Sequence, residues 1–308
     1  MSSPSPTSTT ARSRVFVTRR VPERVRAELA RSFDLDVHDE EQPAPRAELL
    51  ERAAGCDGLV TMLTDGVDEE LLDAAGPQLK IIANYAVGLD NVDLDECARR
   101  GIVVSNTPDV LTDATAEMTI ALMLALTRRV VDGDRLVRRR EPWLWAPTFM
   151  LGHGLAGLTL GIVGFGRIGQ AVARLAEAHG MHVIRTRETP LDQLLAAADV
   201  VSLHVPLIPE THHLIGEREL ALTKPTAYLV NTSRGPVVDE AALARTLAEG
   251  RIAGAALDVF EREPGVEQEL LSFDNVVLTP HLASATLEAR EAMGMLCVDA
   301  LRAVLTSP

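Results

Sequence analysis

The chain has 308 residues, which is long for a single hydrophobic core, and it carries a formal net charge of −14 at pH 7. This length predicts two domains. A uniformly acidic chain repels a phosphate backbone, which excludes nucleic acid as a general partner.

The N-terminus and the cysteines bear on where the protein works. The first 13 residues are rich in Ser, Thr and Pro and predict a disordered tail, with a transit peptide as the weaker alternative. The longest apolar run, residues 118–126, is too short to cross a bilayer. Three widely spaced cysteines without a CxxC pair indicate neither a disulfide framework nor a zinc site. We therefore expect a cytoplasmic protein with no membrane segment and no metal.

Short β-rich runs alternate with helical patterns from residue 14 onward, which is typical of parallel α/β layers. In the first third, the predicted strands are RVFVT, DGLVT, LKIIAN and IVVSN, and the predicted helices cover residues 23–32, 46–54, 68–75 and 93–99. This series predicts one small doubly wound domain.

A long helix is predicted from Asp113 to about residue 139, because helix formers fill the segment and no Gly or Pro precedes Gly133. An irregular arm follows over residues 141–157 and holds both tryptophans. Exposed aromatics on an arm often mark a subunit contact, and filling of the domain junction is the equal alternative.

A second α/β series begins at Leu158. Its predicted strands are TLGIVG, residues 182–184, DVVSLHVP, TAYLVNTS, GAALDVF and NVVLTPH, and the last helix covers residues 287–305. We expect a second parallel sheet from this series.

A glycine-rich turn opens the second series. The strand over residues 159–163 runs into Gly164, Phe165, Gly166, Arg167, Ile168 and Gly169, and a helical pattern follows. Between a strand and a helix, the GxGxxG spacing is typical of dinucleotide binding, because the pyrophosphate then sits at the positive end of the helix. A purely structural turn is the alternative that this context disfavours.

The residues after the second strand bear on which dinucleotide is bound. An acid usually ends this strand and binds the ribose of NAD, but here Arg185 and Arg187 precede Glu188. Two arginines suit a 2′-phosphate, so NADP(H) is favoured over NAD(H), with two surface arginines as the alternative. The next helical pattern is reached at Leu191, so we expect a missing strand and an unusual or incomplete adenosine pocket.

Three polar side chains, Arg234, Glu263 and His281, each follow a predicted strand of the second series. The carboxyl ends of parallel strands line one crevice, so these residues are expected to converge. A histidine can give and take a proton near neutral pH, and a carboxylate on its other nitrogen fixes the tautomer. A guanidinium can clamp a substrate carboxylate. The set predicts reduction of a 2-oxo acid by hydride transfer.

Taken singly, each of the three has a structural explanation, such as a paired arginine, a solvated glutamate or a capping histidine. Together, beside a dinucleotide turn, they favour catalysis. The other histidines lack comparable neighbours, and the adjacent His212 and His213 lack a third metal ligand.

In the first series, the segment NYAVG at residues 84–88 follows a strand and contains small residues, among them Ala86, Val87 and Gly88. Backbone N–H groups in such a turn can receive a carboxylate. In isolation, the segment would be interpreted as an ordinary turn.

From residue 79 to residue 286 the chain resembles the D-isomer-specific 2-hydroxyacid dehydrogenases. The motifs, in family order, are NYAVGLDNVD, NTPDVLTDATAE, LGIVGFGRIG, DVVSLHVPL, LVNTSRGPVVDEAAL, AALDVFEREP and NVVLTPHLASAT. Within the family, PTFMLGHGLAGLTLGIVG and the arginines after the second strand are most similar to glyoxylate/hydroxypyruvate reductases.

The resemblance implies an α/β protein of two doubly wound parallel-sheet domains. A Rossmann dinucleotide domain would cover residues 108–285, and a smaller flavodoxin-like substrate domain would combine residues 14–107 and 286–308. It also implies a homodimer through the dinucleotide domain, and a small 2-oxo acid as substrate.

The resemblance further assigns roles to residues. His281 would be the acid/base, Glu263 would support it, Arg234 would bind substrate, and Ala86, Val87 and Gly88 would lie at the substrate carboxylate. The residues along the cofactor would be Thr115, His204, Val205, Pro206, Thr232, Ser233, Asp258 and Ala283.

Two alternatives remain at this point. The same fold could serve phosphoglycerate, formate or phosphite, although the turn at residues 85–88 carries no feature for the last two and no regulatory domain is appended for the first. A non-catalytic dinucleotide-sensing protein, like the corepressors of this family, could also retain all three polar residues.

Overall fold

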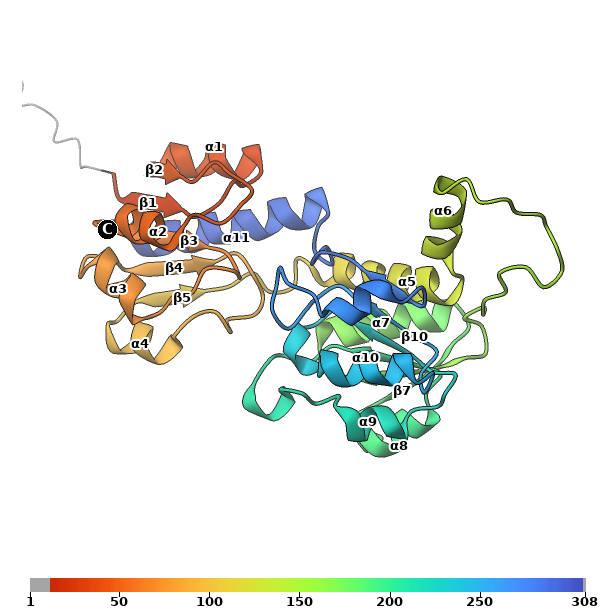
Figure 1. The fold of residues 1–308 in the computed structure, drawn as a ribbon. Helices are drawn as coiled ribbons and strands as arrows, with labels where there is room; N and C mark the ends of the chain where they lie inside the picture. The colour runs from red at the N-terminus through yellow and green to blue at the C-terminus, as the bar shows by residue number, and fades with distance from the viewer. Residues whose placement is uncertain (1–11, 307–308) are drawn as a thin grey trace, which may run out of the picture. The chain divides into compact units, whose positions relative to one another are not determined.

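Figure 1 traces the fold in a computed structural model, which describes residues 12–306. The chain forms two compact units. The first unit runs up to Val110 and resumes at Leu287, and the second unit spans Leu111–Thr286. The predicted disordered tail, residues 1–13, lies outside the described residues except for Arg12 and Ser13. The Ser13 carbonyl already accepts a hydrogen bond of 3.0 Å from Asp34 N–H.

The first unit is a five-stranded parallel sheet in the order β2-β1-β3-β4-β5, which is the flavodoxin-like order. Its strands are β1 (Arg14–Val17), β2 (Asp34–Val37), β3 (Gly58–Thr61), β4 (Ile81–Asn84) and β5 (Val103–Ser105). Its helices are α1 (Glu23–Ser32), α2 (Arg46–Ala53), α3 (Glu69–Ala75), α4 (Leu94–Arg99) and α11 (Leu287–Leu305).

The core of the first unit explains why these segments are strands. Every residue of β3 and β4 is buried, as expected for parallel strands covered on both faces. Helices α2, α3 and α4 contribute Leu49, Leu71 and Cys97 to the apolar layer on one face. Helices α1 and α11 pack together, and α11 contacts β3, β4 and β5.

The sequence patterns missed strand β2. Its four residues, DLDV, are exposed or half-buried, and it pairs only with β1 at the edge of the sheet. Aspartate has low strand propensity, so the segment lacks a local signal. Its position is fixed by tertiary contacts, including the ion pair between Asp36 and Arg52 at 2.5 Å.

The second unit is a six-stranded parallel sheet in the order β11-β10-β9-β8-β6-β7. Its strands are β6 (Thr159–Val163), β7 (His182–Arg185), β8 (Val200–Leu203), β9 (Tyr228–Asn231), β10 (Gly254–Leu257) and β11 (Val276–Leu278). Its helices are α5 (Thr112–Thr127), α6 (Val130–Arg138), α7 (Arg167–Ala178), α8 (Leu191–Ala197), α9 (Glu217–Leu222) and α10 (Glu240–Ala248). The expected pair of doubly wound parallel sheets is confirmed.

Helices cover both faces of this second sheet. On one face α5 and α7 pack against the strands, with Met123 and Val172 fully buried between them. On the other face α8, α9 and α10 supply Leu194, Leu220 and Leu243. No helix among residues 12–306 combines the length and the apolar character needed to cross a membrane.

The expected shortening after Ile184 is confirmed. A Rossmann sheet has the strand order 3-2-1-4-5-6, in which β6 takes place 1, β7 takes place 2 and β8 takes place 4. No strand in the described chain takes place 3, so β7 is an edge strand. The chain turns directly from β7 into α8.

The predicted single helix from Asp113 to residue 139 is wrong. It is two helices, α5 and α6, separated at Arg129, which has a left-handed φ of 54°. The end of α5 is set by the returning arm, because His153 N–H donates to the Thr127 carbonyl at 2.8 Å. Gly152 lies so close that a Cβ there would sit 2.3 Å from the same oxygen. The predicted arm has no helix or strand.

Candidate active site

Three neighbouring strands of the second unit end side by side. β10 pairs in parallel with β9 and with β11, and the last residues of the three strands are level with one another. The segments that follow these strands carry Arg234, Glu263 and His281. The sheet therefore brings the three predicted residues to the same carboxyl edge, where parallel sheets bind their ligands.

His281 and Glu263 are in direct contact. The Nδ1–H of His281 donates to Glu263 Oε2 at 2.9 Å, and Phe260 N–H donates to Glu263 Oε1 at 3.0 Å. The two side chains are 22% and 25% exposed. Within residues 12–306, His281 Nε2 has no hydrogen-bond partner, so this nitrogen is available to a reactant.

The charge state of Glu263 follows from its surroundings. Burial alone would raise the pKa of this carboxyl, but the hydrogen bond and charge of His281, the Phe260 N–H and the charge of Arg234 together lower the pKa below its ordinary value. The ionised carboxylate fixes which nitrogen of His281 carries the proton. Arg234 lies within electrostatic range of this pair.

A buried aspartate holds the loop that carries His281. Asp258 is fully buried, and its oxygens accept hydrogen bonds from Thr279 Oγ1 at 2.6 Å and from Leu282 N and Ala283 N at 2.8 Å. Its carbonyl accepts from His281 N–H at 2.8 Å. His281 has a φ of 54°, a conformation that costs about 1–3 kcal/mol outside glycine. Asp258, assigned to the cofactor by resemblance, is thus committed to this loop.

The segment carrying Arg234 packs against the loop carrying Glu263. A Cβ at Gly235 would fall 1.8 Å from the carbonyl carbon of Phe260, so the two backbones are in contact only because residue 235 has no side chain. Arg234 itself is half-buried in an extended conformation, and Asn231 Nδ2 donates to its carbonyl at 2.9 Å. These two contacts fix the backbone at Arg234, from which the guanidinium extends.

The glycine-rich turn has the form that a pyrophosphate requires. Gly164 has a φ of 93°, and a Cβ there would fall 2.4 Å from the carbonyl oxygen of His204. A Cβ at Gly169 would fall 2.3 Å from the oxygen of Gly164, whereas a Cβ at Gly166 would meet nothing within 4 Å. The space at Gly166 lies at the N-terminus of α7, which has no side-chain cap. This end of the helix fits a phosphate group.

The other residues assigned to the cofactor by resemblance lie at several strand ends and on α5. Thr115, Thr232 and Ser233 are buried, and Thr232 Oγ1 lies 2.9 Å from Thr119 Oγ1. His204 follows β8, and its Nε2 lies 2.8 Å from Ser202 Oγ. Burial lowers the pKa of His204, which keeps this imidazole neutral and unsuited to acid catalysis at neutral pH.

The two arginines after β7 differ. The Arg185 guanidinium stacks on the Phe165 ring at 4.5 Å and pairs with Glu188 at 2.8 Å. Arg187 is exposed, and among residues 12–306 it has no hydrogen-bond or ion-pair partner. Thr186 Oγ1 accepts a hydrogen bond from Gly164 N–H at 3.2 Å, which ties this turn to the glycine-rich one.

In the first unit, the turn after β4 presents its N–H groups. Its carbonyls are all engaged: Ala86 O accepts from Thr107 N at 2.9 Å, Val87 O from Asn106 Nδ2 at 2.7 Å and Gly88 O from Asn84 Nδ2 at 3.0 Å. Within the described chain, the N–H groups of Val87 and Gly88 donate to no protein atom. Such paired, unengaged N–H groups can bind an anion.

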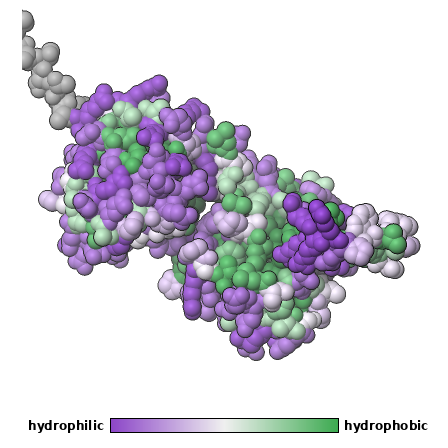
Figure 2. All heavy atoms as spheres, turned by 45° about the horizontal axis from the view of Figure 1, so that its top comes forward, coloured by the Kyte–Doolittle hydropathy of each residue, from purple (hydrophilic) through white to green (hydrophobic). Residues whose placement is uncertain are grey.

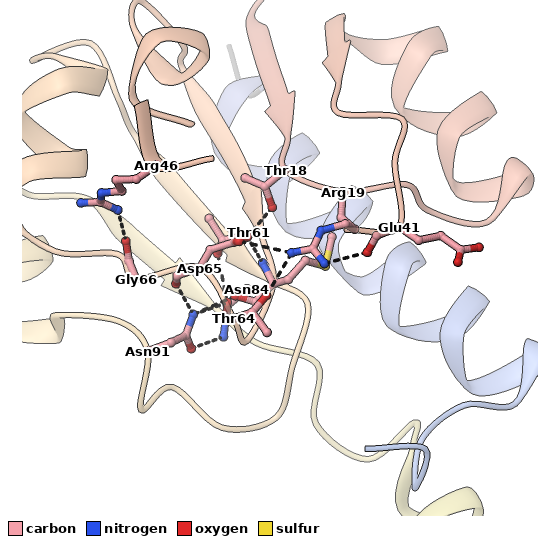
Figure 3. Close-up of polar contacts among 11 residues, drawn as sticks. Thr18, Arg19, Glu41, Arg46, Thr61, Thr64, Asp65, Gly66, Asn84 and Asn91 are labelled. Atoms are coloured by element: carbon pink, nitrogen blue, oxygen red, sulfur yellow. Dashed lines mark hydrogen bonds and ion pairs between the residues drawn. The ribbon is translucent and has the colours of Figure 1, made fainter. Parts of the chain in front are cut away.

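Figure 3 shows the polar network beneath this turn. The side-chain amides of Asn84 and Asn91 bond each other at 3.1 and 3.2 Å, and Asn91 Nδ2 also donates to Met62 O and Asp65 O. Asp65 in turn accepts from Thr18 Oγ1 and, at 2.7 Å, from Met62 N. The network joins the loops after β1, β3 and β4. Asn84 and Asn91 both lie within the NYAVGLDNVD motif, but the sequence did not predict their pairing, which is set by the fold.

The statement that the other histidines lack comparable neighbours is wrong for two of them. His38 Nδ1 lies 3.0 Å from Glu48 Oε1, and the second exception is His213. Its Nε2 is hydrogen-bonded to Glu261 Oε1, and its φ of 52° is left-handed. The partners are 48 residues apart, so sequence spacing gave no signal. Among residues 12–306, no group of three or more His, Cys, Asp or Glu side chains could hold a metal ion.

The sequence profile of the D-isomer specific 2-hydroxyacid dehydrogenase NAD binding domain matches residues 120–283, more than half of the chain. The chain belongs to the D-isomer-specific 2-hydroxyacid dehydrogenase family. A glyoxylate reductase from Thermococcus litoralis is 51% identical to this chain over 92% of this chain and 91% of its own length.

Solved structures agree with this family assignment. A Thermus thermophilus protein superposes with a TM-score of 0.89 at 45% identity, covering 95% of this chain and 97% of its own. An NADPH-dependent glyoxylate/hydroxypyruvate reductase from Sinorhizobium meliloti, solved with NADP and malonate, has a TM-score of 0.81 at 36% identity, covering 95% of this chain and 93% of its own. The chain is therefore an oxidoreductase for 2-hydroxy and 2-oxo acids that uses a nicotinamide dinucleotide.

Proposed function

We propose that this dehydrogenase reduces glyoxylate or hydroxypyruvate, with His281 as the proton donor, Glu263 as its partner and Arg234 as the substrate-binding cation. The observation that carries the proposal is the His281–Glu263 hydrogen bond of 2.9 Å at Nδ1, while Nε2 of the imidazole has no partner among residues 12–306. The name of the Thermococcus relative supports glyoxylate as substrate.

When bound, the reduced nicotinamide supplies the hydride that adds to the carbonyl carbon of the substrate. The protein residues manage the proton and the charge. Nε2–H of His281 donates its proton to the carbonyl oxygen, and the electron pair of that N–H bond remains on the imidazole, which becomes neutral. Glu263 holds the ring through Nδ1, so that Nε2 is left for the substrate. Arg234 polarises the carbonyl and binds the carboxylate.

The turn in the first unit is proposed to bind the substrate carboxylate through the N–H groups of Val87 and Gly88, with Ala86 completing the turn. Its carbonyls are held by three separate donors, so the N–H groups need little reorganisation on binding. We accordingly assign substrate binding to the first unit and dinucleotide binding to the second.

We further propose NADP(H) as the preferred dinucleotide. Arg187 is exposed without a partner among the described residues, and Arg185 lies beside it on the stacked Phe165 ring. A 2′-phosphate would give Arg187 a partner of opposite charge. The relative from Sinorhizobium meliloti is described as NADPH-dependent, which supports this preference.

We propose that the protein is a homodimer through the arm at residues 141–157 of the dinucleotide unit. Trp143, Leu144 and Trp145 are 55%, 84% and 82% exposed there, and α6 has no buried residue. Figure 2 shows apolar side chains among pale ones on this projecting arm. Exposed aromatic groups of this kind are enriched at subunit interfaces.

We also propose that the protein works in the cytoplasm. Its three cysteines are free and buried, which suits a reducing compartment.

The test is steady-state oxidation of NADPH and NADH with a panel of 2-oxo acids. We expect glyoxylate and hydroxypyruvate to have the highest kcat/KM, with NADPH the better donor. Preference for phosphohydroxypyruvate, or oxidation of formate or phosphite in the reverse assay, would replace the proposed substrate. Tight dinucleotide binding without turnover of any acid would identify a dinucleotide sensor instead.

A further inference from the structure

Glu240 is a buried carboxylate outside the three residues discussed above. It is the first residue of α10, follows the N-cap Asp239 and is 4% exposed. Burial raises the pKa of this carboxyl. No ion pair is found for Glu240 within residues 12–306. A carboxylate in this setting is costly unless hydrogen bonds satisfy it, so its partners explain why it is there.

Those partners bracket the loop that carries Glu263. Glu240 Oε1 accepts from Glu261 N–H at 2.7 Å, and Oε2 accepts from Glu267 N–H at 3.3 Å. Glu263 lies between the two donors in sequence. The loop is thus fixed at both ends by the two oxygens of one side chain.

Only a carboxylate satisfies both donors. A glutamine at this position would keep one accepting oxygen, but its NH₂ group would face a backbone N–H that also donates. One buried backbone donor would then lose its partner, at a cost of about 1–3 kcal/mol. The end of the loop facing that donor would be released.

The Glu263–His281 hydrogen bond joins the anchored loop to the His281 segment. Glu263 is held by Phe260 N–H on one oxygen and meets His281 on the other. Phe260 is itself adjacent to Glu261, whose N–H is bound by Glu240. A shift of the loop at Glu261 therefore moves the carboxylate that orients the imidazole.

We propose that Glu240 is a positioning residue for hydride transfer, which sets the loop over residues 260–267 so that Glu263 meets His281 in the reactive orientation. This rests on the proposed function of Glu263 and His281. The residue contacts neither reactant and acts through Glu263.

The test is a double-mutant cycle of E240Q and E263Q, with kcat measured for glyoxylate reduction. E240Q should lower kcat by about tenfold or more, because small misplacements of catalytic groups have effects of this size. The dinucleotide Kd should stay unchanged. Because E240Q acts through Glu263, the double variant should be no slower than E263Q alone. The loss should fall on kcat and leave the KM for glyoxylate within about twofold, because a misplaced proton donor slows the chemical step without removing a substrate contact.

The matched control is E249Q, which removes an acid from the other end of α10. Glu249 is 57% exposed and pairs only with Arg251 among the described residues, so kcat and KM should not change. If E240Q does not fold, E240D keeps the charge on a shorter side chain and enters the same cycle, with a smaller expected loss.

The outcomes separate the two proposals. If E263Q slows turnover but E240Q does not, or if their effects multiply, the positioning role of Glu240 is wrong while the catalytic pair stands. If E263Q leaves kcat unchanged, the proposed function of the pair fails, and the inference about Glu240 fails with it.

Discussion

His281 combines a reactive side chain with an unfavourable backbone conformation. Its φ of 54° is held by hydrogen bonds from its N–H to Asp258 O and Thr279 O, while its ring is held by Glu263. Strain of this kind persists only when surrounding contacts fix it. At this position, stability would favour glycine, whereas the proposed proton transfer requires histidine.

Substitution of His281 should separate these demands. H281A should lower kcat by about 10²–10⁴-fold, because the proton donor is removed. H281G should be equally inactive but more stable than H281A by about 1 kcal/mol, since glycine adopts a positive φ without strain. Activity assays and urea unfolding of both variants check this. Full turnover in H281A would overturn the assigned role, and equal stabilities would remove the strain.

A second prediction at this scale concerns Arg187. R187D should shift the ratio of kcat/KM for NADPH over NADH toward NADH by about tenfold or more, since a hydrogen bond to a charged group contributes about 1.5–3 kcal/mol. R174D, on the exposed side of α7, is the charge-matched control and should leave the ratio unchanged. An unaltered preference in R187D would place the 2′-phosphate elsewhere.

How much was predictable differs from residue to residue. Glu263 and His281 each followed a strand, so the parallel topology alone predicted their meeting. Glu240 also lay within a recognised motif, but its partners at residues 261 and 267 depend on how two loops pack. The hydrogen bonds between Asn84 and Asn91 likewise depend on how the chain packs. No spacing rule encodes such contacts.

At the scale of elements, the sequence periodicity located the strands other than β2, and it did not predict two effects of packing. Helix α5 ends where the arm returns to the Thr127 carbonyl, although its sequence continues to favour helix past that point. Strand β2 forms although its alternating aspartates disfavour it. Both depend on a partner that lies elsewhere in the chain.

Asp199 offers a test of how the second sheet is joined. It precedes β8, and its oxygens accept from Thr159 N–H of β6 and from Lys224 Nζ, both at 2.8 Å. Burial alone would raise the pKa of Asp199, but Lys224 and the Thr159 N–H outweigh it and hold the pKa below its ordinary value. The folded state therefore binds the Asp199 proton more weakly than the unfolded chain does.

The sign of the pH dependence follows. Stability from Asp199 is complete above the unfolded carboxyl pKa and is lost as the pH falls through the lower folded value. D199N should lose about 1–2 kcal/mol at pH 7, and its deficit should shrink below about pH 4. Urea midpoints at both pH values check this, with exposed Glu210→Gln as control. A deficit that is constant with pH would mean that the charge contributes nothing.

At the scale of the whole molecule, the two units differ in what the sequence could predict. The second unit carries a motif whose geometry is common to many proteins, so its cofactor turn was predicted residue by residue. In the first unit, the motif predicted the turn, and only the fold supplied the network that holds its carbonyls. Composition and charge limited the possible classes of protein, but they did not locate the turn in either unit.

The exposed arm predicts the state of assembly. A double variant, Trp143→Ser with Leu144→Ser, should shift the protein from dimer to monomer in sedimentation velocity, because it removes the large apolar groups at the proposed contact. Leu94→Ser removes an apolar residue that is 47% exposed in the first unit and should leave the sedimentation coefficient unchanged. A wild-type monomer, or a dimer that persists in the double variant, would rule out this interface.

Strand β7 is the edge of its sheet because the described chain has no strand in the third Rossmann place. The outer edge of β7 therefore has backbone N–H and C=O groups that pair with no neighbouring strand. This edge is short, and His182 and Arg185 at its two ends discourage accidental pairing with other chains. The β7 edge is also a site where a strand could be added by design. A further parallel strand, inserted before Leu191 together with a crossover connection of about a dozen residues, would find an edge strand to pair with. The preference for NADPH or NADH could then be redesigned at the β7 edge of the sheet, without changing His281 and Glu263 near the opposite edge.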